Sequence, residues 1–166
     1  MAISVPSATL HGKIVDLRAW RPDDAEWYVG ARDEEIFRWT TEPRALDPGV
    51  LRLVIEANTR DPKWVGCAIT DPASGALLGN IALKIEGRAG EAEASYWVAA
   101  EARGRGVASD AVRTLVQWAF EAGSIERVDL FIAPGNTASQ RVAAHAGFQP
   151  AGEIDGSLRF SLLRPS

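Results

Sequence analysis

The sequence predicts an α+β fold, in which a mixed sheet carries helices on its faces. Residues 64–70, 77–85 and 92–98 are apolar runs separated by short turns, a spacing typical of an antiparallel meander. After the polar, glycine-containing stretch 101–106, strand-like and helix-like segments alternate instead. The chain has 166 residues and shows no internal repeat or linker, so a single domain over residues 1–166 is expected.

The first part of the chain is expected to contain a strand and two helices. Residues 14–20 alternate between apolar and polar side chains, as a first strand does. The side expected to be buried comprises Val15, Leu17 and Ala19. Residues 21–24 are predicted to open a helix, because proline and aspartates suit a helix N-terminus. Asp47-Pro48 is predicted to cap a second helix. The predicted buried stripe of that helix is Val50, Leu51, Val54 and Ile55.

The second part of the chain is expected to contain two strand–helix units and a final hairpin. Apolar residues recur at helical spacing over 108–122, and Gly123 is placed to end that helix. Residues 126–132 alternate as a strand, and residues 137–146 form a short helix. The tail, 150–163, is predicted to form a closing hairpin. A crossover through the first of these helices would be right-handed.

Composition limits the kinds of partner. The net charge of −4 at pH 7 argues against general affinity for nucleic acid, which depends on neutralising phosphates. No apolar run approaches the roughly 20 residues that cross a bilayer, and the N-terminal segment does not resemble a signal peptide. The single cysteine, Cys67, excludes an internal disulfide. We therefore expect a cytoplasmic protein with no membrane, nucleic-acid or metal partner.

The segment Arg103–Ala108 reads RGRGVA and lies between a predicted strand and an amphipathic helix. The first turn of a helix presents unpaired N–H groups and the positive end of the helix dipole. Glycines let the backbone approach a ligand, and the two arginines can face phosphate oxygens. A dinucleotide-binding fingerprint fits poorly, because Ser109 stands where the third glycine would be. Taken alone, the segment predicts either an anion site or a solvated turn.

Three motifs in order give the chain a wider resemblance. Arg103-x-x-Gly106-x-Ala108 resembles the pyrophosphate loop of the GNAT acyltransferases. The preceding run, 92–98 (AEASYWV), resembles that family's central strand, and Asn136-x-x-Ser139 followed by Gly147-Phe148 resembles its C-terminal motif. The pattern is most similar to the RimJ/RimL-like branch, which acetylates ribosomal proteins and small amines.

The resemblance implies a mostly antiparallel GNAT sheet that splays between its fourth and fifth strands, here 92–98 and 126–132, with helices on both faces. It implies that acetyl-CoA lies in the gap, with its pantetheine arm paired to the edge of residues 96–98, and that coenzyme A is a product. The implied cofactor-binding residues are Trp97, Val98, Arg103, Gly104, Arg105, Gly106, Val107, Ala108, Asn136 and Ser139.

Acyl transfer to an amine needs a neutral nucleophile, a polarised carbonyl and a partner for the leaving thiolate. The backbone N–H of Val98 is the candidate oxyanion donor. Glu93 is the candidate general base, acting through water; a solvent-facing strand carboxylate is the alternative interpretation, and Glu91 and Glu101 are rivals. The tyrosine that usually serves the family as general acid is replaced by Ala143. Ser139 is therefore the candidate proton donor or hydrogen-bond partner of the thiolate.

The acceptor is expected to be a primary amine of a small molecule or peptide. An α-amine with a pKa near 8 costs about 1.4 kcal/mol to deprotonate at pH 7, whereas a lysine costs roughly 4.6 kcal/mol, which favours an α-amine or another weakly basic amine. Candidate acceptor-binding aromatic residues are Trp27, Phe37 and Trp39, with Tyr28 beside them. For most of them, packing of the helices onto the sheet is the stronger interpretation. Candidate partners for an acidic acceptor are Arg32, Arg38 and Arg44.

Two other functions stay open at this point. One is transfer from a longer or acidic acyl-CoA such as succinyl-CoA, which would need space and a cation near Val98. The other is a catalytically silent CoA-binding domain, which the missing tyrosine at position 143 favours. The pattern fits either a monomer or a homodimer.

Overall fold

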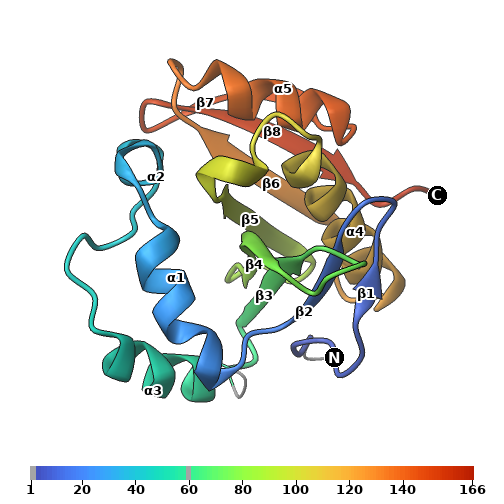
Figure 1. Ribbon diagram of the computed structural model, residues 1–166. Coiled ribbons are helices and arrows are strands. Elements are labelled where there is room, and N and C mark those ends of the chain that lie inside the picture. Colours follow the sequence, from blue (N-terminus) through green and yellow to red (C-terminus); the bar gives the residue numbers. More distant parts are fainter. Residues whose placement is uncertain (1–2, 59–60) are drawn as a thin grey trace.

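The computed structural model describes residues 3–58 and 61–166, and its described strands form one sheet. The strand order is β1-β2-β3-β4-β5-β6-β8-β7 (Figure 1). The strands are β1 (Leu10–His11), β2 (Asp16–Ala19), β3 (Trp64–Thr70), β4 (Leu77–Ile85), β5 (Glu91–Val98), β6 (Arg127–Ile132), β7 (Gln149–Ile154) and β8 (Ser157–Leu163). The helices are α1 (Ala25–Ala31), α2 (Glu34–Trp39), α3 (Pro48–Asn58), α4 (Val107–Glu121) and α5 (Thr137–His145), with short 3-10 turns at Pro22–Asp24 and Ala100–Ala102.

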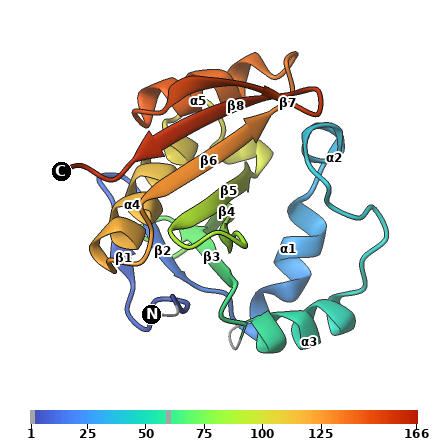
Figure 2. The same ribbon diagram turned by 180° about the vertical axis from the view of Figure 1, so that it is seen from behind.

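Every neighbouring pair of strands is antiparallel except β5 and β6, which are parallel and joined through α4. Their pairing is short, because it runs only from Glu91↔Arg127 to Glu93↔Asp129. Beyond that point β5 continues beside β4 while β6 continues beside β8 (Figure 2). This confirms the predicted mixed sheet and its splay between the strands at 92–98 and 126–132.

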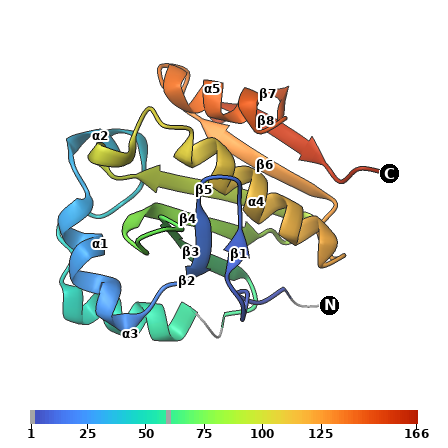
Figure 3. The ribbon, with the colours of Figure 1, turned by 45° about the vertical axis from the view of Figure 1, so that its right-hand side comes forward.

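Helices cover both faces of the sheet. On one face α4 lies across the strands (Figure 3) and buries Ala111, Val112 and Leu115 in the main core. Ala143 of α5 belongs to the same core. On the other face α1 and α3 enclose Trp20 in a smaller cluster. The other buried members of that cluster are Ala25, Leu51, Ile55 and Ala68. Positions 108–122 and 137–146 thus form the predicted helices, with bounds shifted by one residue.

The prediction for α3 was half wrong. Leu51 and Ile55 are buried, but the side chains of Val50 and Val54 are 53% and 41% exposed. Residues four apart share one face of a helix, so Leu51 and Ile55 lie together on the buried face. Val50 and Val54 are each one residue earlier and lie about a quarter-turn away from that face. The predicted Asp47 cap is present, because its carboxylate accepts the Val50 N–H at 3.1 Å.

Two further features differ from the sequence prediction. The segment expected as strand 14–20 is shorter, and it pairs with a two-residue strand, β1, that has no apolar pattern long enough to predict. The helix expected from residue 21 begins as a 3-10 turn and then breaks into α1 and α2 between Arg32 and Asp33. The predicted C-terminal hairpin is present, and its second strand, β8, lies between β6 and β7.

Gly79 of β4 is required by the close approach of β5. A Cβ at this position would collide with the carbonyl oxygen of Trp97 and come within 3.0 Å of the Val98 Cα. We expect Gly79→Ala to reduce the free energy of unfolding by about 1–3 kcal/mol, the usual range for overpacking, as measured by urea denaturation. Gly30→Ala in α1 is the control, because a Cβ there meets nothing within 4 Å. Equal stability of the two variants would contradict this account of β4 and β5.

Candidate active site

A cleft of about 1000 Å³ opens where β5 and β6 separate. Its walls come from β5, from β6 and α5 beyond the gap, from the segment before α4, and from the α2–α3 side of the molecule. Most of the residues that the sequence singled out line this cleft. They are Trp39, Glu93, Trp97, Val98, Arg103, Gly104, Gly106, Val107, Ala108, Asn136 and Ser139.

The backbone of β5 presents an open edge to the gap. Glu86 N donates to Glu91 O at 3.0 Å, and Ala99 N donates to Leu78 O at 2.8 Å. Because N–H and C=O groups alternate in direction along a strand, residues 91, 93, 95, 97 and 99 bond to β4. The N–H and C=O groups of Tyr96 and Val98 therefore face the gap, where β6 has already moved away. A ligand lying in the gap could pair with them as an added strand does.

The start of α4 is built to hold an anion. Gly104 and Gly106 adopt left-handed conformations, with φ of 72° and 78°, which glycine reaches without strain. Gly106 is the N-cap, and no side chain caps the helix. The first bond inside α4 runs from Asp110 N to Gly106 O, so the N–H groups of residues 107–109 precede the helical ladder. These amides and the positive helix end fit a diphosphate at the mouth of the cleft.

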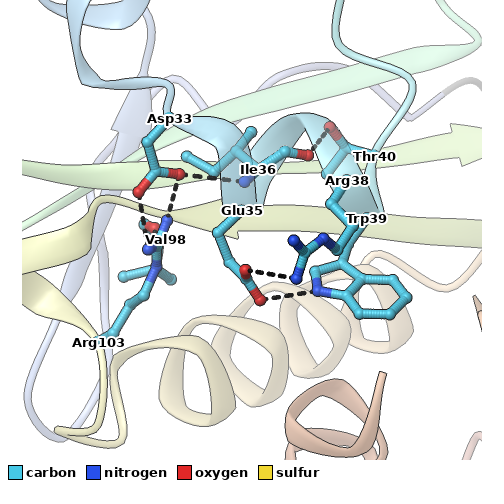
Figure 4. A network of polar contacts seen from close by, with 8 residues as sticks. All are labelled: Asp33, Glu35, Ile36, Arg38, Trp39, Thr40, Val98 and Arg103. Atoms are coloured by element: carbon cyan, nitrogen blue, oxygen red, sulfur yellow. Dashed lines mark hydrogen bonds and ion pairs between the residues drawn. The ribbon is translucent and has the colours of Figure 1, made fainter. Parts of the chain in front are cut away.

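Arg103 is engaged by protein groups rather than turned into open solvent (Figure 4). Its guanidinium forms a fork with the Asp33 carboxylate at 2.8 and 2.9 Å, and its Nε donates to Val98 O at 3.1 Å. Asp33 also caps α2 by accepting the Ile36 N–H at 3.1 Å. Arg103 holds the pKa of Asp33 below its usual value of 3.8. One arginine thus ties α2 to the end of β5. Arg105, by contrast, lies outside the cleft lining.

Two hydroxyl groups meet across the gap. The Tyr96 Oη of β5 and the Ser139 Oγ of α5 lie 2.6 Å apart. Asn136 caps α5, because its Oδ1 accepts the Ser139 N–H at 3.1 Å, which is the cap that its position suggested. Burial raises the pKa of the Tyr96 phenol. The sequence predicts only a backbone role for Tyr96, because Ser139 lies 43 residues away and no local pattern predicts the hydroxyl pair.

Glu93 lies at the base of the gap, in the last paired step between β5 and β6. Its carboxylate is half-buried, and this burial raises its pKa above the usual 4.5. The rival acids are placed differently. Glu91 forms an ion pair with Arg127 at 3.2 Å, Glu101 is exposed on a 3-10 turn, and neither lines the cleft. At about 3.3 Å per strand residue, the backbone positions of Glu93 and Val98 are roughly 16 Å apart. Glu93 could therefore accept a proton from an amine bound near Val98 only through a chain of water molecules.

The family model described as "Acetyltransferase (GNAT) domain" matches residues 15–149. This chain belongs to the GNAT acetyltransferases. YdaF of Bacillus subtilis, which is named as a candidate ribosomal N-acetyltransferase, is 36% identical over 85 residues. That match spans about half of each protein, 51% of this chain and 46% of YdaF. The relatives support assignment to the RimJ/RimL-like branch of the family.

Solved structures share the fold of this acetyltransferase. RimJ of Mycobacterium smegmatis, in complex with CoA-disulfide, superposes with a TM-score of 0.75 at 24% identity, covering 94% of this chain and 86% of RimJ. The spermidine N-acetyltransferase of Vibrio cholerae, in complex with CoA and spermine, superposes with a TM-score of 0.79 at 20% identity, covering 90% and 95% of the two chains. At these identities the likeness establishes the fold.

Aromatic rings form part of the cleft wall. Trp27 stacks between Trp20 and Trp97, with ring centroids 6.3 and 6.0 Å away. Contrary to expectation, Trp27 does not line the cleft, and neither does Phe37, which packs against arginine side chains. The aromatic residues that do line it are Trp20, Tyr28, Trp39, Trp64, Tyr96, Trp97 and Phe131. The roles of Trp20 and Trp64 went unpredicted, because periodicity does not show which face of an element meets a cleft.

Glu42 organises the aromatic wall. Its Oε1 accepts the Tyr28 hydroxyl at 2.5 Å and the Trp97 indole N–H at 3.2 Å, and its Oε2 accepts from Arg32 at 3.1 Å. Arg32 is therefore a buried partner of Glu42 rather than a contact for an acidic acceptor. Arg44 is likewise paired, with Glu34 at 2.6 Å. Arg38 lines the cleft, where it lies 3.5 Å from Glu35 (Figure 4).

Within residues 3–58 and 61–166, no helix is long and apolar enough to span a membrane. The same residues contain no cluster of histidine, cysteine or acidic side chains suited to a metal ion. Cys67 is buried in the core, where burial raises its thiol pKa to about 12.

The two roles of Asp33 can be separated by substitution. Asp33→Ala removes both the α2 cap and the pair with Arg103, and it should lower the free energy of unfolding by about 1 kcal/mol or more. Asp33→Ser keeps a capping oxygen and should recover most of the loss. The pKa of Asp33 is lower in the folded state than in the unfolded chain. The Asp33–Arg103 pair therefore stabilises the fold fully above the pKa that Asp33 has in the unfolded chain. This stabilisation is lost as the pH falls through the lower pKa of the folded state. Denaturation curves showing equal losses for both variants would refute the cap.

Proposed function

We propose that this protein transfers an acetyl group from acetyl-CoA directly to a primary amine. The observation that carries the proposal is one cleft in which an open strand edge, the amides at the start of α4, a half-buried carboxylate and a hydroxyl pair converge. An open edge suits the amide-containing pantetheine arm, and unpaired helix N–H groups suit the diphosphate. The CoA complexes of RimJ and of the spermidine acetyltransferase are consistent with this use of the fold.

The chemistry follows from the residues in the cleft. The amine nitrogen attacks the thioester carbonyl carbon, and the N–H of Val98 stabilises the charge that develops on the carbonyl oxygen. Glu93 takes a proton from the amine through water, which its raised pKa allows at neutral pH. As the C–S bond breaks, its electron pair goes to sulfur and Ser139 faces the departing thiolate. Holding both substrates in one cleft supplies part of the acceleration.

We expect the acceptor to be an α-amine of a peptide or a small monoamine rather than a polyamine. The described acidic residues lining the cleft are Glu35, Glu42 and Glu93. Glu35 already accepts from Trp39 at 2.8 Å, and Glu42 from three donors. A polycation would find few free carboxylates, whereas the aromatic wall suits an apolar or aromatic group beside one amine.

A cytoplasmic enzyme acting as monomer or homodimer remains our expectation.

An acidic acyl group is disfavoured by the state of Arg103. This arginine supplies a cation beside Val98, as succinyl-CoA would require, but Asp33 already occupies both of its terminal nitrogens. Acetyl-CoA, which carries no charge on its acyl group, needs no such partner.

A panel of acceptors tests the proposed function. Free thiol release from acetyl-CoA should accompany acetylation of a short peptide with a free N-terminus or of an aromatic monoamine, with kcat/KM at least about tenfold above that for spermidine. CoA binding without thiol release on any amine would instead show a catalytically silent domain. Acetylation of lysine side chains alone would overturn the expected acceptor class.

Gly106→Asp tests the anion site. It should weaken CoA binding by at least about tenfold, or 1.4 kcal/mol, because it places a like charge against the diphosphate. Gly123→Asp is the matched control: that glycine is also left-handed, with φ of 83°, and meets nothing within 4 Å at the far end of α4. Calorimetry should show normal CoA affinity for the control. Equal affinities for the two variants would remove the loop from the site.

Glu93→Gln tests the base. The acceptor for this test is an arylamine, whose nitrogen is bonded directly to the ring and is already neutral near pH 7. The fall in kcat at acid pH, the acid limb of the profile, then reflects the ionisation of an enzyme group rather than of the acceptor. In the wild type this limb should lie above pH 4.5, since only the ionised carboxylate accepts a proton and its pKa is raised. The variant should lose the limb and at least about tenfold in kcat, with little change in CoA affinity. An unchanged pH profile would exclude Glu93 from the mechanism.

A further inference from the structure

We propose that Tyr96 is a positioning residue that makes Ser139 a directed hydrogen-bond donor to the leaving sulfur; this inference rests on the proposed acetyl transfer. The two side chains come from opposite arms of the splayed sheet, β5 and α5, and both line the cleft. Their oxygens are 2.6 Å apart, which is short for a pair of hydroxyl groups. No other contact joins these arms through side-chain hydroxyls among the described residues.

Acidity decides which hydroxyl donates. A phenol, with a usual pKa near 10, is a stronger acid and a better donor than the aliphatic hydroxyl of serine. Tyr96 therefore donates to the Ser139 oxygen. Each hydroxyl has one hydrogen, so the hydrogen of Ser139 stays available to the cleft. Burial raises the pKa of Tyr96, so the phenol keeps its proton throughout the physiological range.

The rest of the Ser139 environment fixes its position. Asn136 accepts the Ser139 N–H at 3.1 Å, which anchors the first turn of α5. The bond from Tyr96 then sets the rotation of the hydroxyl, and it polarises the Ser139 O–H bond because hydrogen bonds in a chain strengthen one another. The pair thus provides one donor of fixed direction on the wall facing β5.

This arrangement stabilises a thiolate without transferring the serine proton. A serine hydroxyl is a much weaker acid than any thiol, so full proton donation from Ser139 to the thiolate would be unfavourable. When the C–S bond breaks, the electron pair stays on sulfur, and Ser139 donates a hydrogen bond to it. The amine proton passes to Glu93 through a chain of water molecules, and the thiolate later takes a proton from solvent. Neither hydroxyl changes its protonation state.

The binding of coenzyme A reports this interaction without any turnover. Calorimetry should compare the affinities for CoA and for desulfo-CoA, which lacks the sulfur, from about pH 6 to about pH 10, because the alkyl thiol of CoA ionises above the cysteine pKa of about 8.5. In the wild type the ratio of the two affinities should rise with pH by at least about threefold, because the thiolate accepts a stronger hydrogen bond than the thiol. In Ser139→Ala the rise should disappear, and in Tyr96→Phe it should fall to less than half.

Tyr28→Phe is the matched control, because the sequence contains two tyrosines and the Tyr28 hydroxyl also lies in the cleft but binds Glu42. This variant should retain the full rise. In turnover assays Tyr96→Phe should lower kcat about three- to tenfold with unchanged KM for acetyl-CoA. Adding it to Ser139→Ala should cause no further loss, since Tyr96 acts through Ser139.

The outcomes separate this inference from the proposed function. A wild-type protein that binds no CoA would refute both. Wild-type binding and transfer, with Tyr96→Phe showing the full wild-type rise in the affinity ratio, would refute only the role of Tyr96. If Tyr96→Phe unfolds, Ser139→Ala removes the same hydrogen bond from the other side, and a full rise in that variant would also overturn the inference.

Discussion

The structure depends on where β5 and β6 stop pairing. Three register steps, ending at Glu93↔Asp129, hold the two halves of the sheet together, and beyond them each strand keeps only its outer neighbour. A sheet edge left inside a protein carries N–H and C=O groups that need partners. The N–H of Val98 and both groups of Tyr96 are therefore the binding surface that we propose for the pantetheine arm. Gly79 allows β4 to stay close to β5 as far as Val98.

Elements on either side convert the gap into a reaction site. The start of α4 places amides at the mouth, Glu93 lies at the base, and the Tyr96–Ser139 pair joins the two walls. Arg103 links this region to α2 through Asp33, so the proposed acceptor side and the proposed anion site share one ion pair. Asp33 and Arg103 are 70 residues apart in the sequence, yet a movement of α2 would displace the carboxylate that holds Arg103.

Sequence reasoning predicted the parts that depend on local patterns. Apolar runs bounded by short turns located the strands at 64–70 and 77–85, and helical spacing located α4, because burial of one helix face imposes that period. The prediction of buried residues failed where tertiary packing determines which helix face is covered. Val50 and Val54 are as apolar as their buried neighbours Leu51 and Ile55, but their side chains are exposed. Motif spacing predicted that Ser139 lies in the cleft. Its hydrogen bond to Tyr96 joins segments that are distant in the sequence, so it was visible only in the folded structure.

The central claim is that the open edge of β5 and the first amides of α4 together bind acyl-CoA. Backbone amide hydrogen exchange, followed by NMR with and without CoA, tests it at the level of single residues. The account predicts that CoA slows exchange at Tyr96, Val98 and residues 107–109, while amides of β3 in the sheet interior stay unchanged. Protection confined to other segments, or none at saturating CoA, would contradict it.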